Sequence, residues 1–112
     1  MIRTADKDVA RALCQSFNRH FSEGKDVKAC LLLMMNVNKN HVPELRSIDP
    51  EKVLALFNAQ MKVFMPSELR NMTINIIRYV MTTHVNTNIG AADAFQLGIM
   101  IDSQIIPLNK WA

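Results

Sequence analysis

Few side chains in this 112-residue chain have the type and spacing that catalysis or metal binding requires. The histidines are His20, His41 and His84, and no two of them lie three or four residues apart. The sequence contains no HExxH, paired CxxC, Glu-x-x-His, phosphate-binding glycine loop or serine elbow. We therefore expect a protein that is not an enzyme and that holds neither a metal nor a cofactor.

The two cysteines, Cys14 and Cys30, indicate a reducing compartment. We interpret them as reduced thiols packed as small apolar residues, and a disulfide between facing helices is the alternative. The N-terminal segment is charged and has no secretory signal. The longest apolar run, residues 29–35, is far shorter than the roughly 20 residues of a bilayer span. We expect a cytoplasmic protein with no membrane partner.

One carboxylate is predicted to face inward. A helix expected over residues 91–105 puts Asp102 on the same side as Phe95 and Gly98, where Gly98 would allow a close helix crossing. A carboxylate in that position must be paired or hydrogen-bonded. The candidate partners are Arg70, Thr73 and Arg78. We expect this pairing to be structural.

A polar stripe runs along the helix expected over residues 66–86. Its members follow helical spacing: Asn71, Asn75, Arg78, Thr82 and Asn86. Three interpretations stay open, namely a solvated face, a protein-contact face and a DNA-reading face. Asn and Arg recognise base edges, and the preceding helix with the turn at 65–67 would complete a helix-turn-helix. Few basic residues lie near the stripe to bind phosphates, however.

The rest of the 66–86 helix is apolar almost all round, which predicts a central position. Four other helices are expected around it, over 5–22, from Asp26 toward Pro43, over 50–64 and over 91–105. Asp26 and Asp49 are suitable N-caps, and Gly24 is a suitable left-handed stop. The predicted fold is all-α, a compact bundle of about five helices in a single domain spanning residues 1–112.

The second and fourth helices carry more apolar residues than a monomer of this size readily buries. The second helix is either sandwiched between other helices or exposes an apolar strip, and the candidate surface for a partner or for self-association is Leu31, Leu32, Met34 and Met35. The predicted function is a small regulator or adaptor that binds another protein through an apolar helical surface and forms a homodimer. The formal charge of +3, with acids and bases intermixed, leaves a nucleic-acid-binding regulator using the polar stripe as the alternative.

Overall fold

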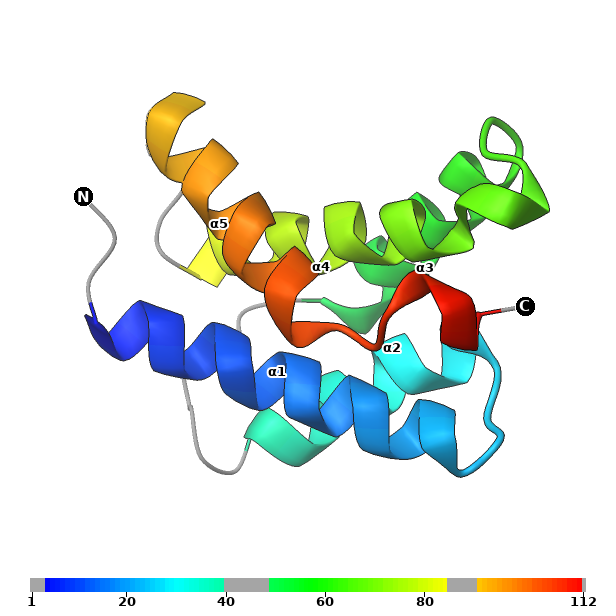
Figure 1. Cartoon of the computed structure of the whole chain (residues 1–112), viewed down its shortest axis with the longest axis horizontal. Coiled ribbons are helices and arrows are strands. Elements are labelled where there is room, and N and C mark those ends of the chain that lie inside the picture. The colour runs from blue at the N-terminus through cyan, green and yellow to red at the C-terminus, as the bar shows by residue number, and fades with distance from the viewer. Residues whose placement is uncertain (1–3, 40–48, 85–90, 112) are drawn as a thin grey trace.

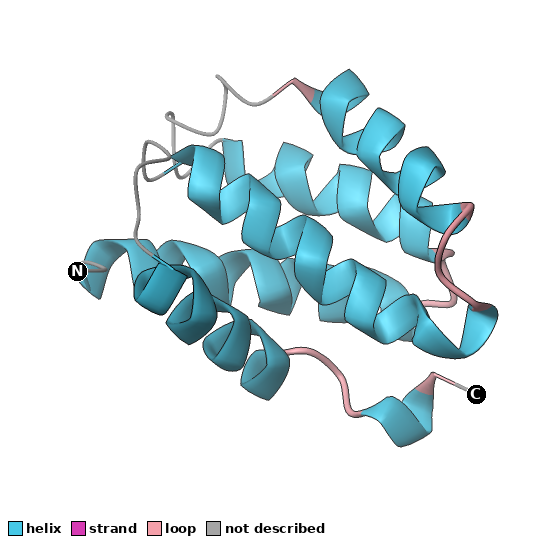
Figure 2. Ribbon diagram, turned by 90° about the horizontal axis from the view of Figure 1, so that it is seen from above, coloured by secondary structure: helices cyan, strands magenta, loops and turns pink. Residues whose placement is uncertain are grey.

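The structure, a computed structural model, describes residues 4–39, 49–84 and 91–111. Every regular element in these ranges is helical (Figures 1 and 2). The elements are α1 (Thr4–Ser22), α2 (Val27–Lys39), α3 (Pro50–Met61), η2 (Pro66–Glu68), α4 (Leu69–His84), α5 (Ala91–Gln104) and η3 (Leu108–Lys110). The predicted all-α bundle is therefore confirmed, with the expected fourth helix divided into a 3-10 turn and an α-helix.

Capping residues set the helix boundaries as their chemistry predicts. The carboxylate of Asp26 accepts a hydrogen bond of 2.8 Å from the backbone N–H of Ala29, at the start of α2. Asp49 accepts one of 2.9 Å from the N–H of Glu51, with Pro50 in the first turn of α3. Gly24 lies in the turn that follows α1 and has φ of +88°, a conformation that glycine adopts without strain. The sequence predictions for these positions are confirmed.

Helix α4 occupies the centre of the bundle, as predicted from its apolar circumference. It packs against each of the other four α-helices. Its side chains make up a large part of the single buried core cluster, contributing Met72, Ile74, Ile76, Ile77, Val80 and Met81. Contact with α4 is therefore common to the four surrounding α-helices, although α1 and α2 pack more extensively on each other than on α4.

The apolar run of α2 lies in the core rather than on a free surface. Leu31, Met34 and Met35 are fully buried within the chain, and Leu32 is half-buried. The reason is that α2 is covered by α1, α3 and α4 together, so more than one of its sides meets apolar neighbours. The expectation that these residues form an association surface is corrected accordingly: only Leu32 retains partial exposure.

Helix α5 is rotated so that Phe95 leaves the expected inward side. Leu97 is buried together with Ile101 and Ile105, which the periodicity of residues 91–105 also places inward, whereas Phe95 is 65% exposed. A Cβ atom added at Gly98 would meet only the Arg78 side chain within 4 Å, at 3.5 Å from Nη1, and no helix backbone. Gly98 therefore lies against an arginine side chain at ordinary contact distance and not at a close helix crossing, and the expected inward position of Phe95 is wrong.

The chain after α5 turns back onto the bundle and is fixed at Ile106. Its N–H donates to the side-chain oxygen of Asn18 over 3.1 Å, and its carbonyl accepts from Arg70 Nε and from Trp111 Nε1, each at 2.9 Å. Trp111 stacks on Phe17 with ring centroids 5.9 Å apart. The tail (red in Figure 1) thus returns to the bundle and anchors the C-terminal end of α5.

Candidate functional site

The outer face of α5 carries two large exposed apolar side chains one turn apart. Phe95 is 65% exposed and Ile99 is 48% exposed. Residues four positions apart lie on the same side of a helix, so the two form a continuous apolar strip, which we call the α5 ridge. Since α5 is held at its C-terminal end by Asn18 and Arg70, the ridge is presented on a fixed helix.

A hollow of about 340 Å³, the α4–α5 groove, borders the ridge on one side. Its lining includes Asn71, Ile74, Asn75 and Arg78 from α4, with Phe95, Gly98, Ile99 and Asp102 from α5. Three members of the predicted polar stripe are thereby brought together beside the α5 ridge. This arrangement was not predicted, because it depends on the rotation of α5.

The five stripe residues do not share one environment. Arg78 donates to the side-chain oxygen of Asn75 over 3.3 Å, while Asn71 is exposed. The hydroxyl of Thr82 donates to the backbone carbonyl of Arg78 over 2.8 Å, so its hydrogen atom is used in a bond within its own helix. Asn86 lies outside the described residues. The first three residues of the stripe line the α4–α5 groove.

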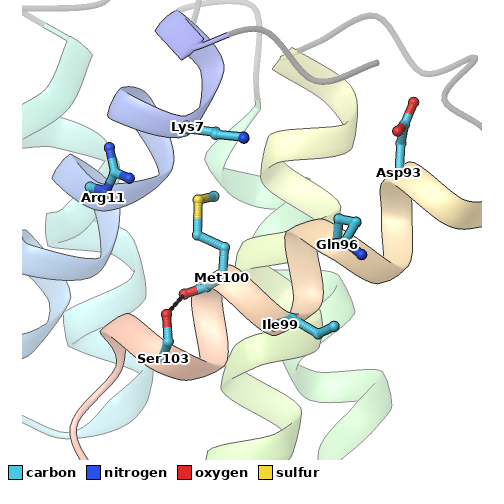
Figure 3. A pocket seen from close by; sticks show the side chains of 7 residues that line it. All are labelled: Lys7, Arg11, Asp93, Gln96, Ile99, Met100 and Ser103. Carbon is cyan, nitrogen blue, oxygen red and sulfur yellow. Dashed lines mark hydrogen bonds between the residues drawn. The ribbon is translucent and has the colours of Figure 1, made fainter.

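A second hollow of about 370 Å³, the α1–α5 groove, borders the other side of the ridge (Figure 3). Lys7 and Arg11 line it from α1, opposite Gln96, Ile99 and Met100 of α5. In Figure 3 the Met100 side chain extends toward Lys7 across the space between the two helices. Ile99 lines both grooves, so the α5 ridge stands between two hollows.

The charged side chains around the ridge differ in whether they form ion pairs with other described residues. Asp8 pairs with Arg11 at 3.0 Å, Asp102 pairs with Arg70, and Asp93 also has an interaction partner. Within residues 4–39, 49–84 and 91–111, no ion pair is formed by Lys7 or by Arg78. The described acids on this face are thus engaged, while these two cations are available to a ligand.

Asp102 pairs with one of its three predicted partners, but it does not face the core. Its side chain is 59% exposed, and the partner is Arg70, whose side chain is only 12% exposed. Arg70 also donates to the backbone carbonyl of Asp102 over 2.8 Å. Thr73 instead donates to the carbonyl of Leu69. The structural role predicted for Asp102 is supported, and its inward position is wrong because α5 is rotated.

The two thiols are poorly suited to act as nucleophiles. Cys14 and Cys30 are free and fully buried. Burial raises the pKa of Cys14 from 9.0 to about 12, and burial, with Asp26 nearby, also raises the pKa of Cys30. A thiolate is the reactive form of cysteine, so burial suppresses reaction at both positions.

The histidines do not form a cluster in the described residues. The His20 side chain is nearly buried, 3.7 Å from the Glu23 carboxylate, and neither ring nitrogen has a hydrogen-bond partner there. His41 and the side chain of His84 lie outside what the structure describes. Within residues 4–39, 49–84 and 91–111, no three His, Cys, Asp or Glu side chains converge as metal ligands. No helix in these ranges has the length and apolarity to cross a bilayer.

Another exposed apolar group lies on the turn after α3 and on the C-terminal tail. It consists of Val63, Met65 and Leu108, and Val63 is 79% exposed. A hollow of about 320 Å³ lies beside Leu108 and Trp111. These residues belong to turns and to a short 3-10 segment rather than to a long helix, so they present a less regular surface than the α5 ridge does.

Sequence reasoning missed the α5 ridge, although a signal was present. Residues 91–105 are apolar on two sides, one containing Leu97 and Ile101 and the other containing Phe95 and Ile99. A helix with two apolar sides can bury only one of them against a single bundle, which predicts that the other is exposed.

Comparisons with protein families, with curated proteins and with solved structures gave no match for this chain.

Proposed function

We propose that this protein is a small non-enzymatic regulator or adaptor that binds another protein through the α5 ridge. The observation that supports this most directly is the exposure of Phe95 and Ile99, side by side on one helix and between two grooves. Burying a Phe or Ile side chain contributes about 1.5–3 kcal/mol each. Aromatic anchors flanked by polar groups are typical of the centre of protein interfaces.

The surroundings of the ridge also favour binding. The polar groups of Asn71, Asn75 and Arg78 lie at its edge and offer donors and acceptors that could fix the orientation of a partner. By contrast, two side chains with catalytic potential are buried or engaged: Cys14 is buried with a raised pKa and Asp102 is paired with Arg70. The free thiols fit a reducing compartment, and we propose a cytoplasmic setting.

Self-association is a weaker part of the proposal and would need a different surface. Because Leu31, Met34 and Met35 are core residues, a homodimer would have to use other exposed apolar side chains, such as Val63, Met65 and Leu108. Nucleic-acid binding through the polar stripe has less support, since Thr82 bonds to its own helix and α5 lies beside the stripe. A mobility shift on duplex DNA that weakens with salt would favour that alternative.

Quantitative affinity capture from cells that express the protein tests the proposal. The ridge variant is Phe95→Ser with Ile99→Ser, and the matched control is Val63→Ser with Leu108→Ser, which removes two other exposed apolar side chains. A partner that uses the ridge is retained by the wild type and by the control, and falls at least about tenfold with the ridge variant. Equal recovery with the ridge variant would contradict the proposal.

A further inference from the structure

We infer that the occupant of the α5 ridge is an acidic amphipathic α-helix of a partner protein. The inference rests on the proposed function and adds the chemistry of the partner. The apolar seam of such a helix would cover Phe95 and Ile99, and carboxylates beside the seam would meet Lys7 and Arg78. Two features of the face support this occupant, namely its charges and their positions on either side of the ridge.

The unsatisfied charge on this face is positive. The described carboxylates at its borders, on Asp8, Asp93 and Asp102, all have partners within the chain or an interaction of their own. Arg78 is half-buried against Gly98, and its one hydrogen-bonded side-chain neighbour is the neutral amide of Asn75. Among the residues that the structure describes, no carboxylate pairs with this partly buried guanidinium, so a ligand carboxylate that pairs with it would gain binding free energy.

The two cations lie on opposite sides of the ridge. Arg78 lines the α4–α5 groove and Lys7 lines the α1–α5 groove, with Ile99 between them (Figure 3 shows the Lys7 side). A partner helix with apolar residues at i, i+3, i+4 and i+7 places its flanking positions on both sides of its seam. Acidic residues at those flanking positions would therefore reach a cation on each side.

The same charges disfavour the other occupants. A second copy would bring its own Lys7 and Arg78 to a face where the described acids are already engaged, and like charges in an interface are unfavourable. A nucleic acid would satisfy the cations through its phosphates but would leave the apolar ridge without apolar contacts. An acidic helix satisfies both the apolar and the charged parts.

Three designed fluorescein-labelled peptides test the inference by fluorescence anisotropy with the full chain. Each has the same helical sequence with leucines at i, i+3, i+4 and i+7, and the flanking positions are all Glu, all Gln or all Lys. The expected result is that the Glu peptide binds at least about tenfold more tightly than the Lys peptide at low salt, with the Gln peptide between them.

Charge variants locate the preference. In the double variant Lys7→Gln with Arg78→Gln, we expect the preference for Glu over Gln to fall to within about twofold. The control Lys52→Gln removes an exposed cation from α3, a helix that does not pack on α5, and should keep the full preference. Circular dichroism establishes that each variant is folded. A preference that survives in the double variant would overturn the inference.

The remaining outcomes separate the inference from the proposed function. Equal binding of all three peptides, lost on Phe95→Ser, would overturn the acidic partner and leave docking on the ridge standing. Undiminished peptide binding by Phe95→Ser would overturn the inference, whereas affinity capture tests ridge docking independently. Three further results would also overturn the inference. They are absence of binding by every peptide, a dimer that becomes a monomer on Phe95→Ser, and displacement of the Glu peptide by duplex DNA.

Discussion

Arg78 lies against Gly98, so that a Cβ atom at position 98 would be 3.5 Å from the guanidinium Nη1. This contact joins α4 to α5 at the floor of the α4–α5 groove. The distance is an ordinary van der Waals separation, so the site has room for a methyl group. The glycine therefore costs helix stability without being required by a close backbone approach.

The first prediction follows from this contact. Gly98→Ala should raise the free energy of unfolding by about 0.5–1 kcal/mol, because alanine loses less backbone entropy in a helix. Urea denaturation followed by circular dichroism measures the change. Gly24→Ala is the contrasting variant: with φ of +88° at that position, it should lower stability by about 1 kcal/mol. A stabilising Gly24→Ala, or a strongly destabilising Gly98→Ala, would contradict this account of the two glycines.

The second prediction concerns Arg70, which donates to the carbonyls of Asp102 and Ile106 and pairs with the Asp102 carboxylate. Arg70→Leu should cost about 2–4 kcal/mol, because several acceptors at the end of α5 lose their donor. The fluorescence of Trp111 should report the loosened tail. Asp102→Asn should cost less than about 1 kcal/mol, since that carboxylate is largely exposed. Equal losses for the two variants would be inconsistent with this division of roles.

The third prediction is a pH dependence that originates at Cys14. Its folded pKa of about 12 lies above the ordinary value of 9.0, so the unfolded chain releases the thiol proton first. The associated stability is present in full below pH 9 and is lost as the pH rises from 9 toward 12, by at most about 1.4 kcal/mol per pH unit. Denaturation of the wild type and of Cys14→Ala between pH 8 and pH 10.5 measures it. The variant should show a shallower decline, and identical slopes would exclude this origin.

The fourth prediction separates core from surface on α2. Met35→Lys should abolish the folded state, because it puts a charge into a fully buried position. Leu32→Lys should keep the helical circular dichroism spectrum, since Leu32 is half-buried and a lysine there can extend its ammonium into water. Thermal denaturation of both variants is the measurement. A folded Met35→Lys that changes only the oligomeric state would restore the original interpretation of α2 as an association surface.

Some features of the molecule could be predicted from the sequence. The caps at Asp26 and Asp49 were predictable because capping is a local interaction between a side chain and the next turn. The central position of α4 was predictable because so much of its circumference is apolar. Local chemistry and a strong apolar pattern were sufficient in both cases.

The site could not be predicted in the same way, because it depends on which side of α5 faces the bundle. Leu97 with Ile101 and Phe95 with Ile99 are alternative apolar sides, and periodicity does not rank them. The choice determines whether Asp102 points inward and whether the polar stripe on α4 meets an apolar neighbour. Likewise, Leu31, Met34 and Met35 are core residues only because α1, α3 and α4 cover α2, and such contacts between helices do not follow from the sequence pattern alone.

Hydroxyl-radical footprinting of the protein, free and in complex with its captured partner, tests the central claim most directly. In the free protein Phe95 is 65% exposed and Leu108 is 63% exposed, so both side chains should be oxidised. The account predicts that partner binding strongly reduces oxidation of Phe95 and leaves Leu108 unchanged. Unchanged oxidation of Phe95 with protection of Leu108 would contradict it and would place the interface on the C-terminal tail instead.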